Sequence, residues 1–108
     1  FSISLNSDGN RVAIGGRDHG GGIPNSPGIT RVYENKNGSW EQVGSDIFQE
    51  DEFEDSAGWS VSLSNDGSIV AIGAPHLTNG GEARVYKEEN GSWVQMGDDI
   101  VTTSNIRS

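Results

Sequence analysis

The chain is short, acidic and rich in glycine. Its 108 residues include 16 Asp and Glu against 7 Lys and Arg, which gives a net charge of −9, and 16 residues are glycine. This length suits one small domain, and the negative charge argues against nucleic acid and against an anionic membrane surface as partners. No apolar run approaches the ~20 residues of a membrane-spanning helix, so membrane insertion is not expected. The absence of cysteine excludes disulfides and thiolate chemistry.

The sequence contains two copies of one unit. Residues 1–16 and 59–74 share nine of sixteen residues, and residues 31–47 and 84–100 share eleven of seventeen. The segment between the matched blocks is five residues longer in the first copy, where it forms a glycine-rich loop at 16–30. The predicted parts are a first unit at 1–47, an acidic connection at 48–58, a second unit at 59–100 and a tail at 101–108.

Each unit begins with a predicted strand and a tight turn. Polar residues, two serines and Asn6, alternate with apolar residues over positions 1–6, and the second unit repeats the pattern over 59–64 with three serines. This is the period of a strand with one buried face, which in the first unit would carry Ile3 and Leu5. The Asp-Gly dipeptide that follows in both units is favoured in tight hairpins.

Three further strands are predicted in each unit. In the first unit, residues 12–15 form a nearly continuous apolar run, which indicates a strand buried on both faces. A third strand is predicted at 31–33, and an Asn-Gly hairpin turn leads to a fourth at 40–43, which ends at Gly44. No segment has a sustained helical period, so we predict essentially no helix.

Four antiparallel strands in a unit of roughly 50–60 residues are typical of a propeller blade. The predicted fold is therefore all-β, with two four-stranded antiparallel blades; a tandem β-sandwich is the alternative. Two blades alone would leave sheet faces in water. Since propellers close with about four to eight blades, we expect further blades, from a longer chain or from other copies, to complete the ring.

Aromatic residues recur at equivalent positions of the two units. Trp40 matches Trp93, and Tyr33 matches Tyr86, which indicates packing between adjacent sheets. An exposed platform on which sugars stack is the alternative. Trp59 lies on the predicted first strand of the second unit and is expected in the core.

The two units resemble FG-GAP repeats, the blades of the integrin α-subunit type of propeller. The resemblance is carried by Gly58-Trp59-Ser60-Val61-Ser62-Leu63 and by Gly73-Ala74-Pro75, whereas Gly15-Gly16-Arg17 replaces Gly-Ala-Pro in the first unit. It implies an extracellular or cell-surface protein with a binding or adhesion role. Many members of that family also hold calcium in the turn between the first two strands of a blade.

Calcium would require more oxygen ligands than these turns supply. At the positions of the family's calcium pattern, only Asp8 and Asp66 with their following glycines are retained, and one carboxylate cannot provide six to eight ligands. We therefore expect plain hairpin turns and no cofactor, with Asp8 and Asp66 as the weak candidates for a calcium site.

The long loops should share one end of the blades, because successive connections alternate between the two ends. That end is the expected ligand face for a protein or glycan partner. Its candidate residues are Asp18, His19, Asp51, Asp55 and His76.

Asn37 and Asn90 each begin an Asn-Gly-Ser sequence at equivalent positions, which makes both candidates for N-glycosylation. The same dipeptide also suits a hairpin turn without any modification.

No nucleophile elbow, phosphate-binding loop or metal-ligand cluster is recognisable, so we expect no enzyme. The predicted function is a non-catalytic structural or interaction module of a surface protein. The alternatives are a calcium-dependent, lectin-like adhesin and a non-catalytic blade pair within a larger enzyme.

Overall fold

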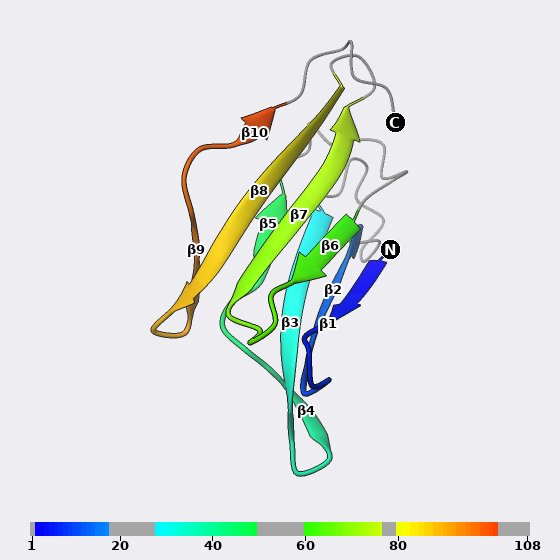
Figure 1. The fold of residues 1–108 in the computed structure, drawn as a ribbon, viewed down its shortest axis with the longest axis vertical. Helices are drawn as coiled ribbons and strands as arrows, with labels where there is room; N and C mark the ends of the chain where they lie inside the picture. The colour runs from blue at the N-terminus through cyan, green and yellow to red at the C-terminus, as the bar shows by residue number, and fades with distance from the viewer. Residues whose placement is uncertain (1, 18–27, 50–59, 77–79, 102–108) are drawn as a thin grey trace.

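The computed structural model describes residues 2–17, 28–49, 60–76 and 80–101 and folds them into two antiparallel sheets (Figure 1). The first sheet contains β1 (Ser2–Leu5), β2 (Arg11–Arg17), β3 (Gly28–Lys36), β4 (Ser39–Gln42) and β5 (Ile47–Gln49). The second contains β6 (Ser60–Leu63), β7 (Ile69–His76), β8 (Gly80–Glu89), β9 (Ser92–Gln95) and β10 (Ile100–Val101). These ranges contain no helix, as predicted, and hence none that could span a membrane.

The two sheets share one topology. In the first, the strand order is β1-β2-β3-β4, with β5 also paired to β3; in the second, β6, β7, β8, β9 and β10 repeat this arrangement. The Asn-Gly dipeptides adopt positive φ at both residues, for example 56° at Asn37 and 95° at Gly38, which suits a tight two-residue hairpin turn. The prediction that each unit contains four antiparallel strands, in the order of the chain, is therefore confirmed.

A fifth short strand in each sheet was not predicted. The fourth strand breaks at Gly44, where φ is 71°, and the chain then pairs with β3 again through β5. Gly97, with φ 72°, precedes β10 in the same way. β5 therefore includes the first residues of the predicted connection at 48–58, and β10 includes Val101, the first residue of the predicted tail. Strands of two or three residues are too short to show a period in the sequence.

Two loops are shorter than predicted because strand pairing continues into their glycine-rich ends. β2 and β3 remain paired as far as Arg17 and Gly28, both of which belong to the predicted loop. β7 and β8 remain paired as far as His76 and Gly80, so His76 ends a strand instead of lying in a loop. The tight turns gather at one end of the sheets, as the alternation of connections predicted (Figure 1).

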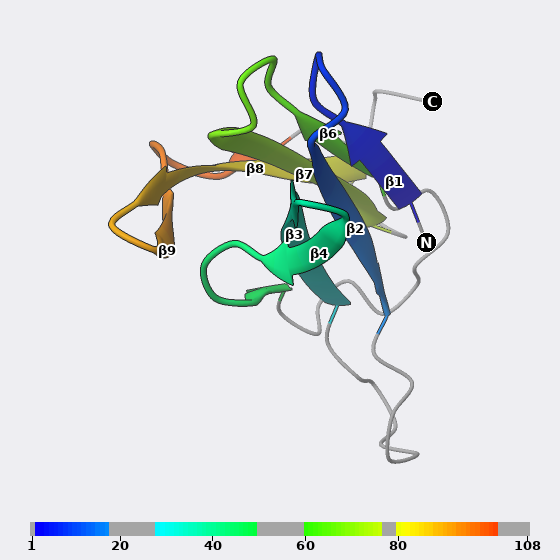
Figure 2. The same cartoon turned by 90° about the horizontal axis from the view of Figure 1, so that it is seen from below.

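The sheets pack face to face as a wedge. Viewed from below, they approach each other at β1 and β6 and diverge toward β4 and β9 (Figure 2), and both β1 and β2 contact β6. One hydrophobic core fills the space between them. Its buried residues are Ala13, Val32, Val43 and Ile47 from the first sheet and Val61, Leu63, Val70, Ile72 and Trp93 from the second.

Within the described residues, only one face of each sheet is covered, which corrects two predictions. Ile3 and Leu5, expected on the buried face of the first strand, are both exposed, and the serines of β1 face the other sheet instead. The apolar run in β2 is not buried on both faces, because Ala13 is buried while Val12 and Ile14 are half-buried. Alternation shows which residues share a face of a strand, but which of the two faces is buried depends on the neighbouring sheet.

Candidate functional site

The strongest feature of the molecule is the interface between its two sheets. Trp93 lies at the open end of the wedge, where its Nε1 donates a hydrogen bond of 2.8 Å to the carbonyl oxygen of Val43. A Cβ atom on Gly44 would lie 2.9 Å from the Trp93 Nε1 and 3.0 Å from the backbone oxygen of Gly91. Glycine at position 44 is therefore required both by its positive φ and by the close approach of the indole.

Three hydrogen bonds, between two pairs of residues, join the sheets at the narrow end of the wedge. The backbone N–H of Leu63 donates to the Ser4 Oγ over 3.1 Å. The backbone N–H and the Oγ of Ser7 both donate to the carbonyl oxygen of Asn65, at 3.1 and 3.0 Å. These bonds fix the register in which the second sheet lies on the first.

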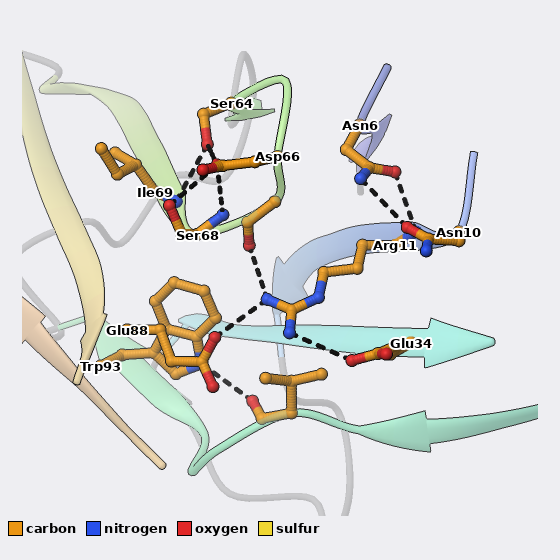
Figure 3. A network of polar contacts seen from close by, with 12 residues as sticks. Asn6, Asn10, Arg11, Glu34, Ser64, Asp66, Ser68, Ile69, Glu88 and Trp93 are labelled. Atoms are coloured by element: carbon orange, nitrogen blue, oxygen red, sulfur yellow. Dashed lines mark hydrogen bonds and ion pairs between the residues drawn. The ribbon is translucent and has the colours of Figure 1, made fainter. Parts of the chain in front are cut away.

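Arg11 links the sheets near their tight turns (Figure 3). Its Nη1 donates to the carbonyl oxygen of Gly67 and to the Glu88 Oε1, both at 2.9 Å, while its Nη2 donates to the Glu34 Oε1 at 3.0 Å. Burial lowers the pKa of Arg11, but the hydrogen bonds to Glu88 and then Glu34 outweigh that effect and raise the pKa above its ordinary value. One guanidinium thus compensates two carboxylates that come from different sheets.

A triad of Arg, Asp and Gln recurs in both sheets with the same geometry. In the first sheet, the Arg31 Nε and the Gln42 Nε2 donate to the Asp46 Oδ1 at 2.9 and 2.6 Å. In the second, the equivalent bonds from Arg84 and Gln95 to Asp99 measure 3.0 and 2.6 Å. Each triad ties the break in the fourth strand back to the sheet.

The triads also lower the pKa of both aspartates. Hydrogen bonds from Arg31 and then from Gln42 lower the pKa of Asp46. Those from Gln95 and then from Arg84 lower the pKa of Asp99 to about 2. Both carboxylates are therefore charged at neutral pH, and each supports its own strand break.

Equivalent residues of the two units have opposite burial. Trp93 is 9% exposed, whereas Trp40 is 47% exposed. In the same way, Val61 and Leu63 are buried, whereas their equivalents Ile3 and Leu5 are exposed. The prediction that these tryptophans pack between sheets is thus confirmed for Trp93, whereas within this chain it is wrong for Trp40. We call the exposed set Ile3, Leu5 and Trp40 the Trp40 face.

The second sheet also has an uncovered face, and this face carries the equivalents of residues that are buried in the first sheet. Val43 is 9% exposed beneath Trp93, whereas its equivalent Met96 is 44% exposed. Ile47 is buried, whereas its equivalent Ile100 is exposed. Val94 is also exposed and lies on the side of β9 opposite to the buried Trp93. We call Val94, Met96 and Ile100 the Met96 face.

Asp8 and Asp66, the weak candidates for calcium, lie in the two Asp-Gly turns. The Asp66 Oδ1 accepts hydrogen bonds from the Ser68 backbone N–H, the Ser68 Oγ and the Ser64 Oγ, and these bonds lower its pKa (Figure 3). The Asp8 Oδ1 accepts one bond from the backbone of Asn10. These are the contacts of hairpin turns, and no group of three or more His, Asp or Glu able to hold a metal is found within the described residues.

The remaining predicted site residues are distributed as follows. Asn37 and Asn90 are exposed at the tips of the β3–β4 and β8–β9 hairpins, with positive φ in both cases. His76 is the last residue of β7. Trp59 and the predicted loop residues Asp18, His19, Asp51 and Asp55 lie outside the described residues.

Sequence reasoning missed both the two triads and the residues that join the sheets, although a signal for the triads was present. Arg31, Asp46 and Gln42 all have identical equivalents in the second unit, so the repeat alone indicated a shared structural role for the triad. Arg11 gave no such signal, because its equivalent is Ile69.

Comparisons with family models, with curated proteins and with solved structures found no match for this chain.

Proposed function

We propose that the chain is a non-catalytic interaction module made of two successive blades of the propeller type. The observation that supports this proposal is the opposite burial of equivalent residues, above all of Trp93 and Trp40. It means that the sheets stack head to tail: one face of the first unit packs against the opposite face of the second.

This arrangement favours propeller-type stacking over a sandwich of two like sheets. In a sandwich that is symmetric between the units, both copies would turn the same face inward, and equivalent residues would be buried together. Head-to-tail stacking instead leaves one half of the interface uncovered at each outer surface. The wedge between the sheets, narrow at β1 and β6, is the shape that successive blades need around a central axis.

The wider biological role follows from the resemblance to FG-GAP repeats. We propose an extracellular or cell-surface location and a binding or adhesion role, with a protein or glycan partner on the end that carries the long loops. This part of the proposal rests on the sequence motifs around Trp59 and Gly73-Ala74-Pro75.

A tandem fusion of two copies tests the stacking. Ten residues, 50–59, join β5 to β6. Residues 102–108, an inserted Ala-Gly and Phe1 give the same spacing of ten between β10 of the first copy and β1 of the second. If the units are blades, the Trp40 face of the second copy covers the Met96 face of the first, because the connection holds it at high effective concentration.

The readout is the melting temperature, since the stability of stacked repeats includes a term for each interface. We expect the fusion to melt about 5 °C or more above the single chain. Trp40→Ala in the second copy should abolish the gain, whereas the same change in the first copy should not, because that face stays free. A fusion that melts like the single chain would contradict the proposal.

A further inference from the structure

We propose that a second copy of this chain docks on the molecule head to tail, with the Trp40 face of one copy on the Met96 face of the other. The docking repeats the register of the internal interface and rests on the proposed function. It adds the identity of the partner, since the internal interface already consists of the equivalents of these two surfaces.

The Met96 face holds a preformed acceptor for an indole. The Met96 backbone N–H donates to the carbonyl oxygen of Val85 over 2.7 Å, just as that of Val43 donates to Val32. A Cβ on Gly97 would meet no atom of the described chain within 4 Å, whereas one on Gly44 would meet Trp93. The space that Trp93 occupies inside the molecule is thus vacant at the outer surface.

These equivalences assign the central contact. Trp40 of one copy lies over Gly97 of the other and donates its indole N–H to the Met96 carbonyl oxygen, as Trp93 does to Val43. Tryptophan buries a large apolar area and supplies one directional donor, which makes it a frequent anchor of protein interfaces.

The narrow end of the wedge supplies a second contact. Ser62 is the equivalent of Ser4 and is exposed on the second sheet, so its Oγ can accept the backbone N–H of Leu5 from the next copy. Ile3 and Leu5 then lie over Ala71 and Val85, the half-buried equivalents of the fully buried Ala13 and Val32.

The Trp40 face needs little rearrangement to bind. Its Arg31–Asp46–Gln42 triad already has the distances of the Arg84–Asp99–Gln95 triad at the internal interface. The Arg31 side chain is nevertheless 45% exposed, against 12% for Arg84. The side chains are thus ordered before the face is covered, which reduces the entropic cost of docking.

One element of the internal interface is not repeated. Ile69 replaces Arg11, and Asn35 replaces Glu88, so the outer interface lacks the ion pair that Arg11 and Glu88 form between the sheets. Docking between copies is therefore weaker than packing within the chain and should depend on concentration. Because each copy carries a net charge of −9, added salt should strengthen the association by screening their repulsion.

Sedimentation velocity over a concentration series, up to the solubility limit, tests the proposal. We expect the chain to associate reversibly, and Trp40→Ala and Met96→Asp each to raise the dissociation constant on the order of 30-fold or more, the effect of losing an interface hot spot. Phe48→Ser is the matched control. Phe48 is exposed, but its equivalent Val101 is also exposed, so the proposed register leaves Phe48 uncovered.

Mixing the two variants gives the sharpest test. The Trp40→Ala chain keeps its Met96 face and the Met96→Asp chain keeps its Trp40 face, so a head-to-tail contact predicts that the mixture forms a one-to-one dimer and nothing larger. If either variant fails to fold, as judged by circular dichroism, Leu5→Ser and Ile100→Ser replace the pair.

Three results overturn the proposal: a wild-type chain that stays monomeric at all concentrations, association that Phe48→Ser weakens as much as Trp40→Ala does, and variants that do not pair when mixed. If free chains stay monomeric while the tandem fusion is stabilised, the blade proposal holds and only docking between copies fails. If the fusion is not stabilised either, both proposals fail.

Discussion

The two sheets of this molecule differ less in sequence than in which face they bury. The first sheet buries the face that carries Ala13, Val32 and Val43. The second sheet buries the face that carries Val61, Leu63 and Trp93, and this is the opposite face when the two units are compared residue by residue. Equivalent residues are therefore core in one unit and surface in the other. Burial here therefore depends on the neighbouring sheet and not on the residue itself, so substitutions at equivalent positions should have unequal effects.

The largest inequality is expected between the two tryptophans. Trp93→Ala should reduce the free energy of unfolding by about 3–5 kcal/mol, because it leaves a cavity between the sheets, and it also removes the donor to the Val43 carbonyl oxygen. Trp40→Ala should cost less than about 1 kcal/mol, as expected for an exposed side chain.

Urea unfolding, at a protein concentration where the chain is monomeric, measures the free energy of unfolding that each of the two variants loses. Equal losses for the two variants would show that the tryptophans act within their own hairpins and not between the sheets.

The two glycines that follow the fourth strand provide a second unequal pair. Gly44→Ala and Gly97→Ala both place a side chain at a positive φ, which costs about 1–2 kcal/mol. The Cβ of Gly44→Ala also collides with the Trp93 indole and with the Gly91 backbone oxygen, which should add about 1–3 kcal/mol of overpacking.

Thermal melts of the two variants under identical conditions give this comparison directly. The collision should also push the indole away from its position, so the fluorescence of Gly44→Ala should change while that of Gly97→Ala should not. A larger loss for Gly97→Ala would be incompatible with the interface described above.

Arg11 is a third position at which equivalent residues of the two units differ, because its equivalent is Ile69. Arg11→Ile, which introduces the residue found at the equivalent position 69, should cost about 1–2 kcal/mol, since it leaves two partly exposed carboxylates without their cation. Adding Glu88→Asn, which matches Asn35, should recover part of that loss by removing one of the two charges.

A double-mutant cycle on unfolding free energies measures the coupling. A double variant whose loss equals the sum of the two single losses would mean that Arg11 and Glu88 do not interact.

The sequence predicted the strands well because their signals are local. Alternation, the Asp-Gly and Asn-Gly turns and the repeat placed four strands in each unit, and they also placed the break at Gly44. The exposure of Trp40 could not be predicted, because it depends on which sheet lies beside it. Arg11 was missed for a related reason: its partners Gly67 and Glu88 lie on the other unit, far along the chain.

The smallest expected effect concerns the two triads at low pH. Because the pKa of Asp99 is lowered to about 2, its charged form stabilises the folded state above the unfolded value of about 3.9. That contribution should be lost as the pH falls from about 4 to about 2, and it should be small because the Asp99 carboxylate is solvent-exposed.

Carboxyl NMR titration should place Asp99 at about 2 and Asp46 below its ordinary value. Gln95→Ala should raise the pKa of Asp99 and leave Asp46 unchanged, while Gln42→Ala should do the reverse, because each amide donates only to the aspartate of its own sheet. The triads have the same geometry whether or not their face is covered. The pKa values of the two aspartates should therefore change with these local substitutions and not with the protein concentration at which copies associate. Such a result would show that each unit forms its triad by itself, without the contacts that a neighbouring sheet provides.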